Sequence, residues 1–282
     1  MQEAISLNWT EQYWNQVERN IGYIKLREQE LLRTTPIAVL GVGGLGGPLA
    51  EQLVRSGCER LVICDDDIFE SSNLNRQVCT RNDLGKYKVE VLKEYLKAIN
   101  PHVAIRSYYE VTEENIAEIL EGVQIVALTL DDTITSILIA RTCQKREIPM
   151  LESWAVPYIC SWWFTPNSVD YETCYGMDTH NLTIEQMRTS KEIQTKVIEA
   201  LIPKVLQFPG FRSTLDRENG TLQRMISGQI SLRSLAPIVR LTASYLAFEV
   251  IYAGILTVKE KNLAPNVIGY DYLRMRQITL KI

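Results

Sequence analysis

The chain of 282 residues has only two histidines, His102 and His180, and six cysteines that form no Cys-x-x-Cys pair. Neither histidine has a cysteine or carboxylate partner at metal-ligand spacing, so we interpret both as structural or surface residues. The cysteine spacing argues against a zinc knuckle and against a dithiol redox site. Scattered, unpaired cysteines are typical of a reducing compartment, and we expect a cytoplasmic protein.

Long apolar runs and charge excess are also missing. No uncharged apolar segment approaches the roughly 20 residues that span a bilayer, and the start MQEAISLNWTEQYWNQ has neither the basic end nor the apolar core of a signal peptide. Thirty basic residues face 34 acidic ones, a formal net charge of −4 without long blocks of one sign. We therefore expect no membrane partner, and a nucleic-acid partner is disfavoured.

Strand-like and helix-like segments alternate through the first half of the chain. After an arm with helical spacing at 8–33, strands are expected at 36–41, 61–67, 103–110, 124–130 and 149–153, with helices at 48–57, 86–98, 115–122 and 133–146. The strands are apolar without alternation, as in parallel sheets covered on both faces. The pattern predicts an α/β fold with a doubly wound, Rossmann-like, mostly parallel sheet and helices on both faces.

The second half changes character. YICSWWFTP predicts a half-buried strand added antiparallel to the sheet, and 183–207 predicts a helix that opens with a capping box of Thr183 and Gln186. The polar stretch 208–224 is interpreted as a mobile loop. Residues 235–253 predict a packed core helix, because Arg240 and Glu249 interrupt its apolar run, and two short strands close the chain.

A glycine-rich loop, Gly41-Val42-Gly43-Gly44-Leu45-Gly46, lies between an expected strand and an expected helix. Glycine allows positive φ and close approach of the backbone, and a helix N-terminus offers unpaired N–H groups to a phosphate. Asp65 follows 19 residues after Gly46, where a carboxylate accepts ribose hydroxyls. These features alone favour a nicotinamide or flavin enzyme.

The next segments change that preference to a triphosphate. Asn73, Arg76 and Gln77 in SSNLNRQ and Lys88 in LGKYKVE bring cations and amides that hydride transfer does not need. Arginine and lysine stabilise the charge that develops on a reacting phosphate. Asp131, at the end of the fourth expected strand, is where a magnesium-binding carboxylate would face the phosphates.

The strings LGVGGLGGPLA, DDDIFESSNLNRQ, LGKYKVE and LKAINPHV, in this order and spacing, resemble the adenylation core of the ThiF/MoeB/E1 superfamily. SLAPIVRLTASYLAFEVI resembles the last helix of that family, so the resemblance covers most of the chain. It implies an enzyme that uses ATP and magnesium to adenylate a substrate carboxylate and release pyrophosphate. It also implies an N-terminal helical arm, 1–35, and an adenylation domain, 36–282, in which 154–230 faces the substrate and 231–282 supplies the last helix and strands.

The resemblance implies roles for twelve residues. Those implied to be catalytic are Arg19, Arg76, Lys88 and Asp131, and those implied to contact the nucleotide are Gly41, Gly43, Gly44, Gly46, Asp65, Asp67, Asn73 and Gln77. Asp131 is the implied magnesium ligand, but Asp132 stands where many relatives have Asn, so either aspartate could act. Arg19, in VERNI, resembles an arginine that reaches the partner's site in a homodimer; the alternative is a surface arginine.

Departures from the family pattern separate this chain from many members. Cys174 and Met177 stand where relatives carry the first Cys-x-x-Cys pair of a structural zinc, which implies that no zinc is bound. No cysteine is obviously placed to take over the substrate as a thioester. Cys79, just after the NRQ motif, is either a reactive thiol or a packed one, and packing is favoured.

The aromatic residues around 154–163 also have two interpretations. Trp154, Tyr158, Trp162 and Trp163 either line a substrate groove or form the apolar face of an edge strand, and we favour the second.

These departures favour a specialised member acting on a peptide or small carrier protein, as in the maturation of a ribosomally made peptide. The arm before residue 36 is too short for a fused peptide-recognition domain, so recognition is expected in 175–230 or in a separate protein. The alternatives are a tRNA-modifying dehydratase of the same superfamily, a nicotinamide-dependent oxidoreductase and an inactive scaffold.

Overall fold

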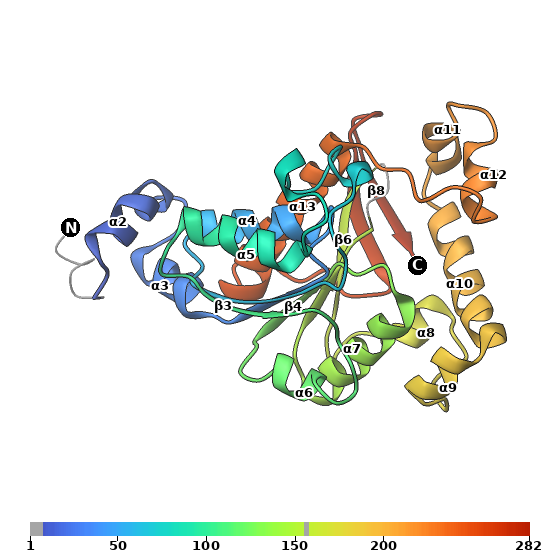
Figure 1. Cartoon of the computed structure of the whole chain (residues 1–282), viewed down its shortest axis with the longest axis horizontal. Helices are drawn as coiled ribbons and strands as arrows, with labels where there is room; N and C mark the ends of the chain where they lie inside the picture. The colour runs from blue at the N-terminus through green and yellow to red at the C-terminus, as the bar shows by residue number, and fades with distance from the viewer. Residues whose placement is uncertain (1–7, 155–157) are drawn as a thin grey trace.

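The computed structural model describes residues 8–154 and 158–282. Its centre is an eight-stranded sheet in the order β3-β2-β1-β4-β5-β6-β7-β8 (Figure 1). The first five strands are parallel: β1 (Ile37–Leu40), β2 (Arg60–Cys64), β3 (Ala104–Tyr108), β4 (Ile125–Leu128) and β5 (Met150–Glu152). The last three are antiparallel: β6 (Ile159–Phe164), β7 (Asn266–Asp271) and β8 (Arg276–Lys281). The predicted fold class is confirmed.

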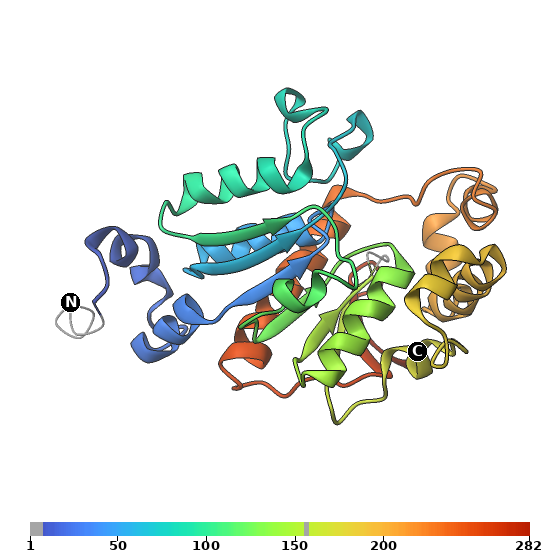
Figure 2. The same ribbon diagram turned by 60° about the horizontal axis from the view of Figure 1, so that its bottom comes forward.

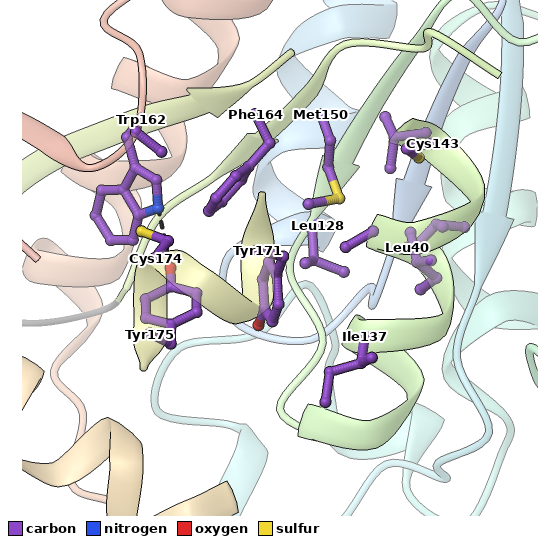
Figure 3. Close-up of a cluster of buried hydrophobic side chains, with 14 of the residues drawn as sticks. Leu40, Leu128, Ile137, Cys143, Met150, Trp162, Phe164, Tyr171, Cys174 and Tyr175 are labelled. Atoms are coloured by element: carbon purple, nitrogen blue, oxygen red, sulfur yellow. Dashed lines mark hydrogen bonds between the residues drawn. The ribbon is translucent and has the colours of Figure 1, made fainter. Parts of the chain in front are cut away.

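Helices cover both faces of this sheet. Figures 1 and 2 show one layer formed by α4 (Gly46–Arg55), α5 (Lys88–Ile99) and α13 (Ala236–Phe248), and an opposite layer formed by α6 (Ile116–Ile119), α7 (Thr133–Lys145) and α8 (Tyr171–Tyr175). Alternate strand residues divide between two buried clusters, with Leu40 and Leu128 on the α7 side (Figure 3) and Val39 on the α4 side. The order β2-β1-β4 reverses direction at β1, where ligands bind in such sheets.

Strand β6 lies inside the sheet, paired with β5 on one side and β7 on the other. Trp162 belongs to the cluster on the α7 side and Trp163 to the cluster on the α4 side, and both are fully buried. The expectation of a half-buried edge strand is therefore wrong, because the last two strands of the chain cover the edge that β6 would otherwise expose.

Residues 184–226 form a helical arm beside the sheet (Figure 1). The expected helix 183–207 is two helices, α9 (Ile184–Thr189) and α10 (Lys191–Leu206), and the predicted capping box of Thr183 and Gln186 is confirmed. The expected mobile loop is wrong: it contains α11 (Phe211–Leu215) and α12 (Thr221–Ile226). Each starts after a glycine with positive φ and buries an apolar side chain, Phe211 or Leu222.

The last helix continues from α13 as a π-helical segment, Glu249–Ile255. Together, Ala236–Ile255 are long and apolar enough to cross a membrane by length and composition, with a mean hydropathy of 1.4. Val239, Ala243 and Val250 are nonetheless buried in the cluster shared with α4 and the sheet. The helix thus packs as a core helix, as its sequence predicts.

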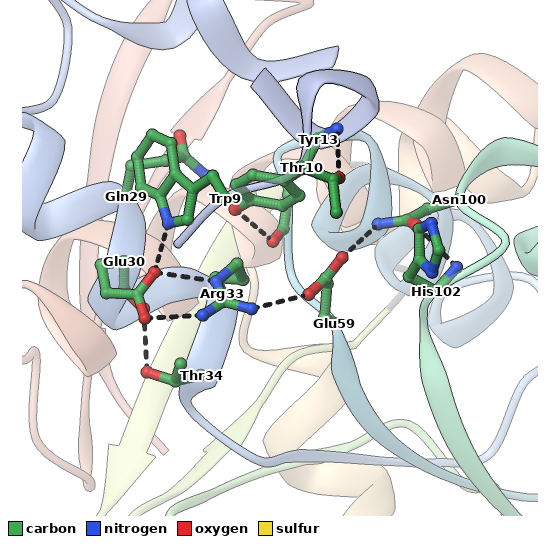
Figure 4. A network of polar contacts seen from close by, with 11 residues as sticks. Trp9, Thr10, Tyr13, Gln29, Glu30, Arg33, Thr34, Glu59, Asn100 and His102 are labelled. Atoms are coloured by element: carbon green, nitrogen blue, oxygen red, sulfur yellow. Dashed lines mark hydrogen bonds and ion pairs between the residues drawn. The ribbon is translucent and has the colours of Figure 1, made fainter. Parts of the chain in front are cut away.

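The N-terminal arm comprises α2 (Glu11–Val17), the 3-10 turn Glu18–Asn20 and α3 (Leu26–Thr34). Figure 4 shows its polar network, in which Arg33 donates hydrogen bonds to both Glu30 and Glu59. The side-chain amide of Asn100 donates to the other carboxylate oxygen of Glu59 at 3.1 Å. The Tyr13 hydroxyl donates to the carbonyl of Gly57, beyond the end of α4. These contacts fix the arm at the amino-terminal edge of the parallel strands.

An arginine network lies around the segment that contains Cys174 and Met177. Arg141 on α7 makes two hydrogen bonds to the carboxylate of Glu172 and donates to the carbonyls of Thr179 and Leu182. His180 lies 2.9 Å from the carboxylate of Asp170, which corrects the view that it has no acidic partner. Asp170, Glu172 and His180 could approach one ion together, but the oxygens of Glu172 already accept from Arg141.

We predict that Arg141→Ala lowers the free energy of unfolding by about 2–4 kcal/mol, because Glu172 would keep a buried charge without its partner. Lys196→Ala, which removes a fully exposed pair with Glu192, is the matched control and should leave the free energy of unfolding almost unchanged. Urea unfolding of the two variants measures both values. Equal effects would show that the Arg141 network does not stabilise the fold.

A second buried carboxyl, Glu152 at the end of β5, has no cationic partner among the described residues. It accepts hydrogen bonds from the hydroxyls of Tyr175 at 2.6 Å and Tyr171 at 3.4 Å. Burial raises its pKa to about 7, and the hydrogen bonds only partly oppose that rise. The protonated, neutral form therefore suits this site at and below neutral pH.

Because the pKa of Glu152 is raised in the folded state, the unfolded chain loses this proton first as pH rises. Stability should fall between pH 4.5 and pH 7 and then level off. Glutamine does not titrate, so we predict that the stability of Glu152→Gln relative to the wild type rises by about 2 kcal/mol from pH 5.5 to pH 8. Unfolding curves of both proteins at the two pH values measure this, and a pH-independent difference would contradict it.

Candidate functional site

The turn from β1 into α4 has no room for side chains at two of its glycines. Gly41 has a φ of +93°, and a Cβ there would lie 2.5 Å from the carbonyl oxygen of Thr129. A Cβ on Gly46 would lie 1.8 Å from the carbonyl oxygen of Gly41. The loop therefore packs backbone against backbone at the carboxyl ends of β1 and β4, which explains why the sequence has glycine at both positions.

The N-terminus of α4 lies at this same edge. In its first turn the N–H of Gly47 donates to the carbonyl of Gly43 at 3.2 Å, the N–H of Leu49 donates to the carbonyl of Leu45 at 3.0 Å, and Pro48 has no N–H. The helix dipole, and not a row of unpaired amides, is therefore what suits an anion here. Two predicted residues lie beside the loop. A Cβ added to Gly43 would lie 3.7 Å from the Gln77 side chain, and a Cβ added to Gly44 would lie 3.5 Å from the Arg76 side chain. The glycine loop and the NLNRQ motif thus come together.

Asp65 directly follows β2 and is 6% exposed. Its carboxylate accepts from the backbone N–H of Val42 in the glycine loop at 2.8 Å and from the N–H of Asp67 at 3.1 Å. Burial raises its pKa, and the charge of Lys88 opposes that rise. The strand expected at 61–67 ends at Cys64, so a turn, and not strand alternation, brings Asp67 beside Asp65.

Lys88, the first residue of α5, is buried between these two aspartates. Its Nζ lies 2.5 Å from Asp67 and 3.7 Å from Asp65. A buried ammonium needs such partners, because desolvation of an isolated charge costs several kcal/mol. The pairing holds a positive charge next to the predicted ribose site.

The side chains of the NLNRQ motif differ in their surroundings. Asn73 closes a 3-10 turn by accepting from the N–H of Glu70 at 3.0 Å. Arg76 donates to the carbonyl of Ser72 and to Asn75. Gln77 is 7% exposed, and its Oε1 has no hydrogen-bond partner in residues 8–154 and 158–282. Asn73 therefore stabilises its own turn, whereas the side-chain oxygen of Gln77 is still able to accept a hydrogen bond from a ligand.

A cavity of about 580 Å³ opens at the carboxyl ends of β2, β3 and β4. Asp65 and Asp131 both line it, so the predicted ribose and magnesium residues share one cavity. The rest of its wall is formed by Cys64, Asp66, residues 109–114, Leu130, Asp132, Thr135, Ile184, Glu185, Arg188 and Thr189. Leu130, the residue before Asp131, has its N–H beside Gly41, so Asp131 lies on the side of the cavity that borders the glycine loop. A magnesium ion carried by phosphates at the loop would fit its carboxylate.

The two adjacent aspartates of this wall have different partners. Asp132 is the N-cap of α7, and its Oδ1 accepts from the N–H of Thr135 at 2.6 Å. The Asp131 side chain makes no hydrogen bond or ion pair with the part of the chain that the structure describes. Of the two, Asp131 is therefore the one whose oxygens are available to a metal.

Arg19 lies apart from the other predicted residues. It is exposed, in the 3-10 turn next to Asn20, whose amide donates to the carbonyl of Ser56 at the end of α4. The glycine loop is at the other end of that helix, about 15 Å away for ten residues. Arg19 therefore cannot belong to the site of its own chain, and its role in a partner's site stays a prediction.

The remaining candidates fit packing roles. Burial raises the pKa of the Cys79 thiol, which keeps the less reactive protonated form. Tyr158, Trp162 and Trp163 are fully buried, so the interpretation of these three as a substrate groove is wrong. Trp154 is partly exposed and stacks on Tyr175 with ring centres 5.4 Å apart.

Helix α9 belongs to the segment 154–230 that the sequence predicts to face the substrate, but no individual residue of α9 is predicted to line the site. Ile184 and Arg188 line it from a segment more than 100 residues after Asp65, and Arg188 donates to the hydroxyl of Thr135 at 2.9 Å. No motif contains these residues, and helical spacing alone does not tell which cavity a helix borders.

We predict that Gly46→Ala abolishes nucleotide binding and lowers the melting temperature, because its Cβ would overlap the Gly41 carbonyl. Gly43→Ala is the matched control for the melting temperature, since its Cβ would make only an ordinary contact with Gln77. Thermal unfolding and ATP titration of both variants measure the difference. If the melting temperatures of both variants fall by the same amount, the close approach of Gly46 to Gly41 does not determine the conformation of the loop.

Solved structures share this architecture. The crystal structure of PaaA matches with a TM-score of 0.67 and 18% identity, covering 97% of this chain and 75% of PaaA. The structure of Escherichia coli MccB with AMPCPP and MccA matches with a TM-score of 0.62 and 19% identity, covering 90% of this chain and 65% of MccB. At these identities the likeness concerns the fold alone.

Curated relatives are more similar in sequence over a shorter stretch. The tRNA threonylcarbamoyladenosine dehydratase of Bacillus subtilis is 34% identical over 144 residues, 49% of this chain and 56% of that protein. The sulfur carrier protein adenylyltransferase of Thermus thermophilus is 34% identical over 137 residues, 47% of this chain and 51% of that protein. The chain thus spans about half the length of the curated relatives it matches.

The sequence profile of the ThiF family matches residues 17–282, which include every strand of the sheet and the whole candidate site. The chain therefore belongs to the ThiF family.

Proposed function

We propose that this protein uses ATP and magnesium to adenylate a substrate carboxylate. The observation that carries the proposal is the meeting of Asp65 and Asp131 in one cavity, next to a glycine loop flanked by Arg76. The similarity to a sulfur carrier protein adenylyltransferase supports this chemistry, and an ATP complex is known for the similarly folded MccB.

In this proposal each predicted residue has one task. Asp65 accepts the ribose hydroxyls, the loop and the α4 N-terminus bind phosphate oxygens, and Asp131 holds magnesium. Arg76, Lys88 and Gln77 lie beside the loop or the ribose site, where cations and amide groups can bind the phosphates. Bound magnesium would neutralise phosphate charge and orient the leaving group.

The reaction needs no proton transfer. An oxygen of the substrate carboxylate forms a bond to the α-phosphorus, the bond from that phosphorus to its bridging oxygen breaks, and the electron pair leaves with pyrophosphate. Charge builds up on the phosphate oxygens in the transition state, so fixed cations such as Arg76 accelerate the step by electrostatic stabilisation.

For the substrate we propose the C-terminal or side-chain carboxylate of a peptide or small carrier protein. Relatives named for a sulfur carrier protein and a solved complex of MccB with MccA support this class. We further propose a homodimer, because Arg19 lies too far from its own site to act there, and a cytoplasmic location.

A second candidate is a tRNA-modifying dehydratase that activates a nucleoside carboxylate. The 34% identity to a tRNA threonylcarbamoyladenosine dehydratase favours it, whereas the net charge of −4 does not. Tight tRNA binding at moderate salt would select this function over a peptide substrate. A nicotinamide-dependent reaction is less compatible with the cations at the site, and NADH binding without ATP binding would replace the adenylation proposal.

We predict that Asp131→Asn reduces the adenylation rate at least about 100-fold, the cost of about 2.7 kcal/mol of lost transition-state stabilisation. The matched control, Asp132→Asn, should change the rate less than about three-fold, because asparagine is an equally good N-cap. Pyrophosphate release with candidate peptides and carrier proteins measures both rates.

Lys88→Met should also reduce the rate, and thermal unfolding must accompany it because the substitution leaves Asp65 and Asp67 unpaired. If ATP binds but the Asp131 and Lys88 variants keep wild-type rates, the proposed roles are wrong.

A further inference from the structure

We propose that Arg188 on α9 packs its guanidinium against the adenine ring of ATP and so contributes to the affinity of the site for ATP. The inference rests on the proposed function, since it places one part of the ATP molecule. It assigns a role in nucleotide binding to the helical arm formed by residues 184–226.

The first argument is the order of groups along the edge of the sheet. The glycine loop, which suits phosphates, does not contribute to the 580 Å³ cavity, whereas Asp65 lies between the loop and the cavity. With the phosphates at the loop and the ribose at Asp65, the base extends away from the loop. The cavity lined by residues 109–114 and by α9 then receives the adenine.

The second argument concerns charge. Among the residues that line the cavity Arg188 alone is cationic, whereas eight are acidic: Asp65, Asp66, Glu110, Glu113, Glu114, Asp131, Asp132 and Glu185. It forms no ion pair with any of them, or with another carboxylate in the described ranges 8–154 and 158–282. A guanidinium held near acids but unpaired keeps its flat face available, and arginine stacks well on aromatic rings.

The third argument is that Arg188 is held in place. One of its terminal nitrogens donates to the hydroxyl of Thr135, which is 8% exposed at the start of α7. Ile184 and Met187 on the same helix are buried, and the capping box at Thr183 fixes the helix start. The side chain is therefore anchored at one edge of the guanidinium, which lowers the entropy lost on stacking.

The test compares binding of ATP with binding of inorganic tripolyphosphate, both with magnesium, by isothermal titration of the full chain. We expect Arg188→Ala to weaken ATP binding about ten-fold, which corresponds to about 1.4 kcal/mol, because the cation–π contact with the base is lost. Tripolyphosphate binding should change less than about two-fold, because that ligand has no base. In steady state the KM for ATP should rise while kcat stays the same.

Two further variants sharpen the comparison. Thr135→Val removes the anchor of Arg188 and should weaken ATP binding about two- to three-fold, a positioning effect. Arg212→Ala removes an exposed arginine on α11, outside the cavity, and should leave both ligands unchanged. Melting temperatures of all variants check that each one folds.

The outcomes are separable. Unchanged ATP binding by Arg188→Ala overturns this inference while the adenylation proposal stands. Equal weakening of ATP and tripolyphosphate also overturns it, because Arg188 would then contact phosphate. If the wild-type protein binds no ATP, the adenylation proposal itself fails, and the role of Arg188 fails with it.

Discussion

The close backbone approach of Gly46 to Gly41 holds the site together. Because neither residue has a side chain, β1 can turn directly into α4, and the hydroxyl of Thr129 at the end of β4 donates to the Gly41 carbonyl at 2.6 Å. The same turn directs the N–H of Val42 at Asp65 after β2. One loop therefore joins the ends of three strands, and the positions of the phosphate and ribose sites follow from it.

At the carboxyl ends of the parallel strands, the buried charge of Lys88 is paired, whereas the carboxylate of Asp131 is exposed to solvent. Lys88 is enclosed by Asp65 and Asp67, which compensates its desolvation and keeps a cation near the loop. Asp131 and Asp132 are neighbours in sequence and both exposed, yet Asp131 has no partner within the described residues whereas Asp132 caps α7. The cap explains why two identical side chains are suited to different tasks.

The helical arm gains its position from aromatic packing far from any motif. Phe208, between α10 and α11, lies under Trp154 and Tyr158, with ring centres 6.1 Å and 5.7 Å away. Met187 belongs to the same buried cluster, as does Tyr175 (Figure 3). This packing brings α9 to the cavity wall, so the second half of the chain contributes to a site whose motifs all lie in the first half.

The alternation of strands and helices, the glycine loop and the motifs that contain Arg76 and Lys88 could be read from the sequence alone, because they depend on local periodicity, on steric demands of the backbone and on motifs within 50 residues. The interior position of β6 and the helices within 208–224 became clear only from the tertiary structure. It alone brought Arg188 to the cavity. These features depend on contacts between segments distant in the chain, and the local pattern of residues carries no record of which distant surface a helix or strand will meet.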